Sequence, residues 1–263
     1  IMDEHYMILE KLIEAGRTDV LLRYNTNFSH IKFKKWDLQE LWSKFQKDPR
    51  GKVQLFASLD ATGKLAEVAR HGTKWDTVYN NIKTCIADGI EVFVSPTISI
   101  LNVFYVTDLF ETIFKLGVKP DNIVFNNFLS NPASYDIRIL PDELKDELLT
   151  KLQNYFNELE KEEYKQAIQM ALSSWIQYLF SESPYDLLTL QISRRELLRV
   201  TTILDRRRNE NFLEVNPQYT EWFEEIRSTI GNYEKEEVFF RDQTIPLPID
   251  DKTGETFNVN KLI

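Results

Sequence analysis

Polar side chains recur at the ends of the short apolar segments of this sequence. The first segment leads into Asn25, Thr26 and Asn27, and Ser58 and Asp60 lie at the end of the second. A hydroxyl beside a carboxylate suits a ribose or an ammonium group, and amides can hydrogen-bond other polar ligand atoms. Because Ser58 and Asp60 are two residues apart, an extended chain would point both to one face. The structural alternatives are an Asx-type turn at the asparagines and a turn-capping role for Asp60.

Three further residues are candidates for binding. Arg70 lies in a predicted loop at residues 64–72, and its planar guanidinium suits a carboxylate, although a loop arginine is more often in a surface ion pair. Ile98 ends the third apolar segment, where it could form an apolar wall for a flat ring or pack in the core. Asn127 ends the fourth segment and could face a pocket or begin a loop.

Other kinds of catalytic site are disfavoured. The histidines, His5, His30 and His71, are widely spaced and match no metal-binding motif, so no metal site is predicted. The single cysteine, Cys85, lies in a predicted helix and is not expected to act as a nucleophile. The sequence has no Gly-rich phosphate loop and no nucleophile-elbow motif.

Alternating helical and apolar patterns predict the elements that position these groups. Predicted strands occupy residues 20–24, 53–59, 91–98 and 122–128. Predicted helices precede them at residues 3–15, 37–45, 74–87 and 103–116. This alternation predicts an α/β fold with a parallel sheet, and the near-apolar strands favour burial on both faces. Reactive groups in such folds gather at the C-terminal ends of the strands.

The number of strands favours an incomplete barrel. Four strands cannot close a barrel, and an open sheet ending at residues 20–24 would leave an apolar edge. The chain also begins at Ile1, two residues before a predicted helix that has nothing ahead of it to pack against. We therefore expect residues 1–140 to form a partial (β/α) TIM-like barrel whose first strands are missing.

Beyond Pro141 the pattern becomes helical. Predicted helices occupy residues 142–159, 162–180, 184–209 and 217–228. We predict a helical C-terminal region at residues 141–230 and an extended tail at residues 231–263. The arginines of the third of these helices are interpreted as a solvated helix face paired with nearby acids.

Composition limits the expected partners. Asp and Glu number 41 against 32 Lys and Arg, and the net charge of −9 disfavours a nucleic-acid partner. No apolar run is long enough to cross a membrane, so no membrane partner is expected. A single cysteine and the absence of a signal peptide favour a cytoplasmic location.

Read in order, the predicted strand ends resemble a known family. The likeness is carried by Asn-Thr-Asn at 25–27, Ser-Leu-Asp at 58–60, Arg-His-Gly-Thr-Lys-Trp-Asp at 70–76 and Pro-Thr-Ile-Ser-Ile-Leu-Asn at 96–102. These stretches are similar to the third to sixth strands of the radical S-adenosylmethionine (SAM) barrel, and in particular to the twitch domain-containing radical SAM proteins of phages and marine microbes. The likeness covers residues 1–150 and weakens beyond them.

The resemblance implies a SAM site at the strand ends. It implies that Asn25 and Asn27 lie near SAM, that Ser58 and Asp60 reach its ribose or methionyl part, and that Arg70 pairs with its carboxylate.

For the later strands, the resemblance implies that Ile98, with Asn102 nearby, borders the adenine. It also implies that Asn127 faces the pocket.

The family's cluster ligands are absent from this sequence. Family members carry a C-x3-C-x2-C motif that binds a [4Fe–4S] cluster. They also carry a Gly-Gly-Glu-Pro-like segment that holds the SAM amino group. This sequence has neither, and one cysteine cannot replace three thiolates. The resemblance implies the C-terminal portion of an enzyme that, when intact, cleaves SAM reductively to a 5′-deoxyadenosyl radical. That radical would abstract hydrogen from a substrate, for which a peptide is one candidate, and a reductant protein would supply the electron. The chain alone is expected to be inactive.

Two other functions remain open. A degenerate binding or scaffold protein would use the helical C-terminal region as its working surface. A barrel lyase or aldolase would need a strand-end lysine or a set of metal ligands, and no lysine stands at the four predicted strand ends.

Overall fold

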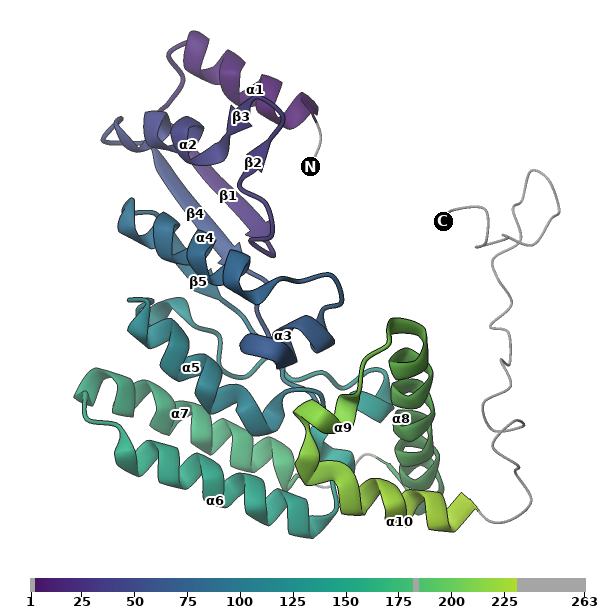
Figure 1. Cartoon of the computed structure of the whole chain (residues 1–263). Helices are drawn as coiled ribbons and strands as arrows, with labels where there is room; N and C mark the ends of the chain where they lie inside the picture. The colour runs from purple at the N-terminus through teal and green to yellow at the C-terminus, as the bar shows by residue number, and fades with distance from the viewer. Residues whose placement is uncertain (1–2, 182–184, 231–263) are drawn as a thin grey trace, which may run out of the picture.

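A parallel sheet stands at the centre of the structure, a computed structural model that describes residues 3–181 and 185–230 (Figure 1). Its strands lie in the order β1 (Leu21–Thr26), β4 (Lys52–Ala57) and β5 (Glu91–Val94). Each strand pairs in parallel with the next one along the sheet. The prediction of an α/β fold with a parallel sheet is confirmed.

Helices lie along one side of the sheet (Figure 1). α1 (Asp3–Glu14) precedes β1, α2 (Leu38–Gln46) and α4 (Trp75–Ala87) connect successive strands, and α5 (Val106–Lys115) follows β5. A small hairpin of β2 (Lys32–Phe33) and β3 (Trp36–Asp37) precedes α2. Another helix, α3 (Gly63–Ala69), follows β4 in a stretch that the sequence predicts as a loop.

The two faces of the sheet differ in how well they are covered. Val53, Leu55 and Ala57 of β4 are buried, whereas the alternating Gln54 and Phe56 are only half-buried. Because successive side chains of a strand point to opposite faces, one face packs against the helices and the other is partly open among the described residues. The prediction of burial on both faces is therefore wrong.

The predicted fourth strand is not a regular strand. Residues 122–128 make only two isolated parallel bridges, Val94 with Ile123 and Ile98 with Phe128. β5 ends at Val94, because Pro96 has no N–H to donate to a ladder. The segment nevertheless follows the sheet, since the Ile98 N–H donates to the Asn127 carbonyl at 2.8 Å.

The second half of the described chain is helical. Its helices are α6 (Asp142–Glu158), α7 (Glu162–Leu179), α8 (Leu187–Arg208), α9 (Phe212–Val215) and α10 (Thr220–Ile230). The Asp186 carboxylate caps α8, so this helix starts three residues later than predicted, and Pro184 lies outside the described residues. The predicted tail at residues 231–263 also lies outside them.

A buried carboxylate links the irregular segment that precedes α6 to the later helices. Asp136 accepts hydrogen bonds from Arg138 Nη2 at 2.6 Å, the Tyr178 hydroxyl at 3.1 Å and the Tyr185 hydroxyl at 2.9 Å. The side chain of Asp136 is 0% exposed, so its charge depends on these donors. The apolar core likewise runs without a break from α1 to α10.

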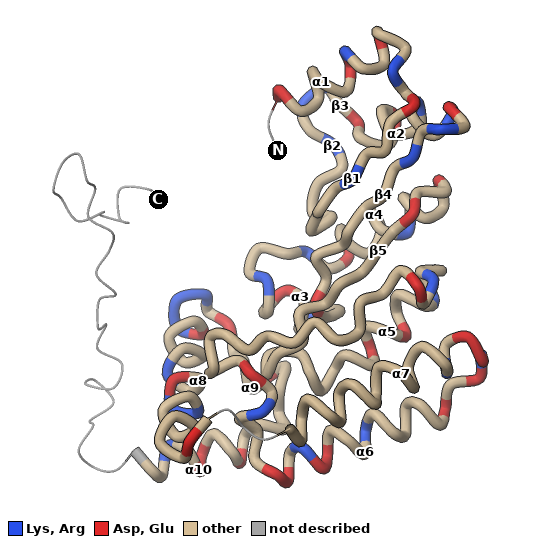
Figure 2. Tube along the Cα trace, turned by 180° about the vertical axis from the view of Figure 1, so that it is seen from behind, with Lys and Arg blue, Asp and Glu red and all other residues tan. Residues whose placement is uncertain are grey.

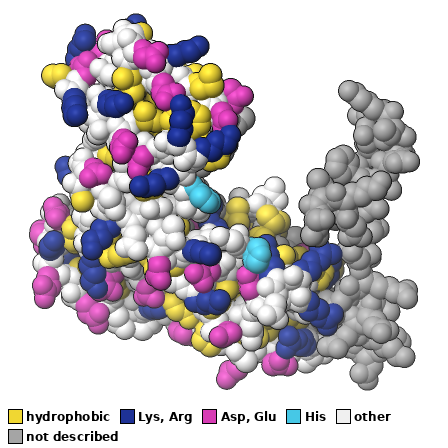
Figure 3. Space-filling model, turned by 45° about the horizontal axis from the view of Figure 1, so that its top comes forward, with side chains coloured by type: hydrophobic (Ala, Val, Ile, Leu, Met, Phe, Trp, Pro, Cys, Tyr) yellow, Lys and Arg dark blue, Asp and Glu magenta, His cyan; other side chains and the backbone are white. Residues whose placement is uncertain are grey.

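Charge is distributed in small groups over the surface. The acidic turn between α6 and α7 and the arginine-rich end of α8 lie far apart (Figure 2). On α8, Arg199 pairs with Glu196 at 2.7 Å, as the interpretation of a paired helix face anticipates. Side chains of both signs are interspersed on the face drawn in Figure 3.

Gly51 supplies a test of the fold. A Cβ atom at this position would lie well inside contact distance of the carbonyl oxygens of Phe45 and Thr18. We expect Gly51→Ala to lower the free energy of unfolding by about 1–3 kcal/mol, measured by urea denaturation. The neighbouring Lys52→Ala, at an exposed position, should change it by less than about 0.5 kcal/mol. Equal stability of both variants would contradict this close approach.

Candidate functional site

Four of the predicted site residues meet above the C-terminal ends of β1 and β4. Asn27, Ser58, Asp60 and Arg70 line one small cavity together with residues of α3. The cavity volume is about 10 Å³, which is the space that one water molecule needs. A larger ligand therefore cannot lie inside it and would have to lie against its outer side.

Asp60 is the centre of this group. Its Oδ2 accepts a hydrogen bond from Arg70 Nε at 2.7 Å and lies 2.7 Å from Nη2 of the same guanidinium in an ion pair, and its Oδ1 accepts the Thr97 N–H at 2.8 Å. The Asp60 side chain is 15% exposed and that of Arg70 is 39% exposed, so the ion pair is partly solvated. A carboxylate oxygen can accept two hydrogen bonds, which leaves Oδ1 able to accept one more.

Asn102 has a structural role in this arrangement. It is 1% exposed, and its Nδ2 donates to the backbone carbonyls of Asp60 at 2.7 Å and Thr97 at 2.9 Å. Its Oδ1 accepts the Ser99 N–H at 2.9 Å. The side-chain amide thus holds the chain after β4 against the chain after β5, and it has no surface to offer a ligand.

The remaining predicted residues are one buried residue, Ile98, and two exposed ones, Asn127 and Asn25. Ile98 is 0% exposed and packs in the core, so its expected role as a wall beside a ring is wrong for this structure: its side chain alternates with Thr97 and points away from the open side. Asn127 is exposed, and its Nδ2 lies 3.4 Å from Thr97 Oγ1. Asn25 is exposed on β1 and does not line the small cavity.

The open face of the sheet extends this site. Asn25, Phe56 and Phe93 lie in one row across the sheet, and the two phenylalanine rings stack with centroids 4.7 Å apart. Both rings are half-buried on the face that none of the described helices covers. They add an apolar patch beside the polar strand ends, where the sequence predicted an apolar wall at Ile98.

A polar row lies next to the phenylalanines. Arg23, Gln54 and Glu91 are paired across the sheet by hydrogen bonds of 2.9 Å and 2.6 Å. The open face differs from the prediction, which rests on the near-apolar character of the strands. The alternation of Lys-Val-Gln-Leu-Phe-Ala at residues 52–57 was the signal that could have shown it.

The residues of this chain do not fit an iron–sulfur cluster. Cys85 lies in α4 and is 0% exposed, and burial raises the pKa of its thiol to about 12. A cluster needs several accessible thiolates. Within residues 3–181 and 185–230, no group of three or more His, Cys, Asp or Glu side chains is arranged to hold a metal ion.

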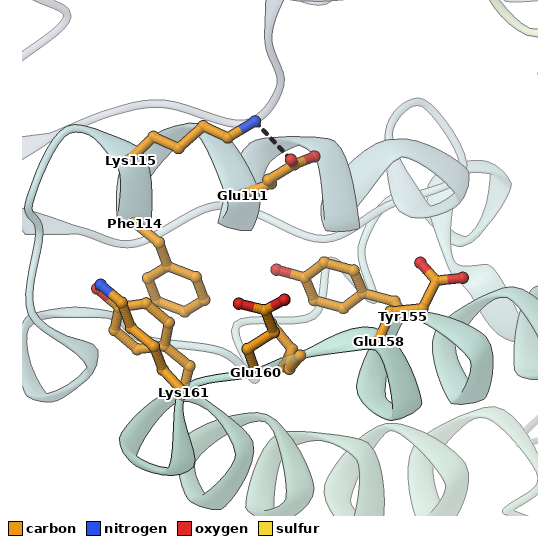
Figure 4. Close-up of a pocket in the computed structure, with 9 residues that line it drawn as sticks. Glu111, Phe114, Lys115, Tyr155, Glu158, Glu160 and Lys161 are labelled. Atoms are coloured by element: carbon orange, nitrogen blue, oxygen red, sulfur yellow. Dashed lines mark hydrogen bonds and ion pairs between the residues drawn. The ribbon is translucent and has the colours of Figure 1, made fainter.

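A larger hollow lies elsewhere, between α5 and the turn that joins α6 to α7 (Figure 4). Its volume is about 340 Å³. Glu111 and Lys115 form an ion pair at its edge, and Phe114 stacks on Tyr164 with centroids 4.1 Å apart. These contacts explain the hollow as a crevice between packed helices, separate from the strand ends.

Asn102 supplies the test of this framework. We expect Asn102→Ala to lower the free energy of unfolding by roughly 2–3 kcal/mol, because it leaves buried backbone groups without partners. The exposed Asn127→Ala should cost less than about 0.5 kcal/mol, and both are measured by urea denaturation. A cost for Asn102→Ala no greater than that for Asn127→Ala would refute the framework role.

The described helices include none that is both long enough and apolar enough to span a membrane. Comparison with protein-family models, with curated proteins and with solved structures found no significant match to this chain.

Proposed function

We propose that this chain forms part of a radical SAM barrel and contributes binding groups for SAM. The observation that carries the proposal is the meeting of Asn27, Ser58, Asp60 and Arg70 at the C-terminal ends of parallel strands. Ligands of parallel α/β folds bind at that end of the sheet. The open face beside it supplies the room that the small cavity lacks.

The polar groups suit the parts of SAM that need hydrogen bonds. Asp60 Oδ1 has acceptor capacity for a ribose hydroxyl, and Ser58 lies beside it on the same cavity wall. Arg70 is held in place by Asp60, so it would meet the SAM carboxylate with donors that the ion pair does not use. Asn25 and Asn127, both exposed, would contact the outer parts of the ligand.

The adenine requires apolar contacts. Phe56 and Phe93 provide an apolar patch on the open face, in the same row as Asn25. An aromatic ligand can pack against such a pair edge-to-face or by offset stacking. We therefore assign the adenine to these rings, in place of Ile98.

A barrel needs further strands beyond those described. β1 is an edge of the sheet, and Leu21 on it is 47% exposed. We propose that further strands of the intact protein pair with this edge and face the open side. The cluster would be held by such a part, and the intact enzyme would cleave SAM reductively and take hydrogen from a substrate, with a peptide as one candidate. The residues of this chain account for binding only.

A binding or scaffold protein is the second candidate. It is favoured by apolar side chains near the start of α8, where Leu187, Leu188 and Ile192 are 78%, 65% and 56% exposed. Exposed apolar groups of this kind mark protein contact surfaces. Under this alternative, the protein would bind a partner through α8 and would not bind SAM.

SAM binding to the protein, measured by calorimetry, separates these functions. Phe56→Leu and Arg70→Gln should each weaken binding by at least about tenfold, which corresponds to about 1.4 kcal/mol. Arg50→Gln is the matched control, because Arg50 is exposed at the opposite end of β4. Unchanged affinity for SAM in both site variants would contradict the proposed SAM site, provided that thermal unfolding shows all three variants to be folded.

The coding sequence that precedes Ile1 gives an independent test. We expect it to encode C-x3-C-x2-C, and the protein that includes this segment, reconstituted with iron and sulfide without oxygen, to release 5′-deoxyadenosine from SAM. A preceding segment without the three cysteines, or a cluster-loaded protein that leaves SAM intact, would count against the proposal.

A further inference from the structure

A second cavity lies on the other side of α3 from the strand-end site. Its volume is about 230 Å³, and its walls come from α3, from the loop at Leu101 and from α8 and α9. Ala69 lines both this cavity and the small one beside Asp60. Figure 1 shows α3 facing α8 and α9 at this place. The volume is below the range of roughly 300–1,000 Å³ typical of drug-sized ligands, so a ligand would be small.

Most of the cavity wall is apolar. Leu65, Val68, Leu101, Leu204 and Phe212 line it. Phe212 is 3% exposed and stacks on Tyr219 with centroids 5.9 Å apart, which fixes that side of the cavity. Such a wall is suited to a short aliphatic or aromatic side chain.

Three charged side chains line the same cavity. Among the described residues, Arg208 makes no hydrogen bond or ion pair, although it is only partly exposed. Asp205 uses its carboxylate to accept the Phe212 N–H, with both oxygens at 3.0 Å. Glu210 is 14% exposed on its side chain and contacts His71 Nδ1 with one oxygen at 2.7 Å.

The charges leave both anion-binding and cation-binding capacity. The guanidinium of Arg208 has planar donors that fit a carboxylate. Asp205 and Glu210 keep acceptor positions for an ammonium group. Burial raises the pKa of the Asp205 carboxyl, and the Glu210 charge adds to this effect, while the Phe212 N–H and the Arg208 charge oppose it.

We propose that this cavity binds a small zwitterion, an α-amino acid with an apolar side chain. Arg208 would pair with its carboxylate, Asp205 and Glu210 would accept from its ammonium group, and its side chain would lie against Leu65 and Phe212. The charges decide between ligand classes, since a fatty acid would leave the remaining acceptor positions of both carboxylates unused and an amine would leave the Arg208 donors unused.

The site would also influence the strand ends. α3 lies between the two cavities, and Arg70 follows directly after it. A ligand that fills the larger cavity would make α3 more rigid and would protect its amides from exchange. The assignment rests on this cavity alone and is independent of SAM binding.

L-phenylalanine is the probe, with binding measured by calorimetry on the full chain. Three analogues each lack one group of the probe. Phenethylamine lacks the carboxylate, 3-phenylpropanoate lacks the ammonium group, and L-alanine lacks the aromatic ring. Each should bind at least about tenfold more weakly than L-phenylalanine, and amide exchange in α3 should slow only with L-phenylalanine. Absence of binding by L-phenylalanine would overturn the proposal, and equal binding of 3-phenylpropanoate would overturn the role of the two carboxylates.

Variants test the residues. Arg208→Gln should weaken L-phenylalanine binding at least about tenfold, and Glu210→Gln should weaken it without weakening the binding of 3-phenylpropanoate, which has no ammonium group for Glu210 to accept from. Arg207→Gln is the matched control, since Arg207 is the preceding residue, is exposed and does not line the cavity. Wild-type affinity in Arg208→Gln would overturn the proposal, and thermal unfolding confirms that each variant is folded.

Discussion

The structure around the candidate site depends on hydrogen bonds that replace a sheet ladder. β4 ends at Ala57 and β5 at Val94, yet the chain must continue in parallel to place its polar groups. The amide of Asn102 bridges the carbonyls of Asp60 and Thr97, and Asp60 in turn accepts the Thr97 N–H. Because these groups are poorly solvated, each would be costly to leave unpaired. The network therefore fixes Asp60, and through it Arg70.

The second constraint is the unequal cover of the sheet. Helices pack on the face that carries Leu55 and Val92, so the opposite face presents Phe56, Phe93 and the strand-end polar groups. The face on which a side chain lies therefore follows from the alternation along its strand. Ser58 lies on the same face as Phe56, and Thr97 on the same face as Phe93. Ile98 lies on the other face and belongs to the core. This alternation explains why Ile98 lies in the interior while Phe56 and Phe93 lie on the open face.

The sequence was informative where the pattern was local. The helical and apolar periods predicted α1, α2, α4 and α5 and three parallel strands, with shifts of a few residues at their ends. They could not reveal α3, which begins at Gly63 with a φ of +56° and has no side-chain cap. Nor could they pair Asp60 with Asn102, 42 residues later, since only folding brings such groups together. Asn27, Ser58 and Asp60 could be predicted to lie together because they follow parallel strands, whereas Arg70 follows α3.

The helical region shares hydrogen bonds and an apolar core with the region of the sheet. Trp175 Nε1 donates to the Phe125 carbonyl at 2.7 Å, and the Tyr219 hydroxyl donates to the Ile100 carbonyl at 2.9 Å. Arg194 Nε donates to the Ile139 carbonyl at 2.8 Å. These carbonyls lie in the irregular segments that follow the sheet, where no strand neighbour accounts for them. Side chains from α7, α8 and the turn before α10 thus supply hydrogen-bond donors to carbonyls that lie outside the regular strands. For that reason, the change from alternating to helical pattern after Pro141 marks a change of element type within one continuous core.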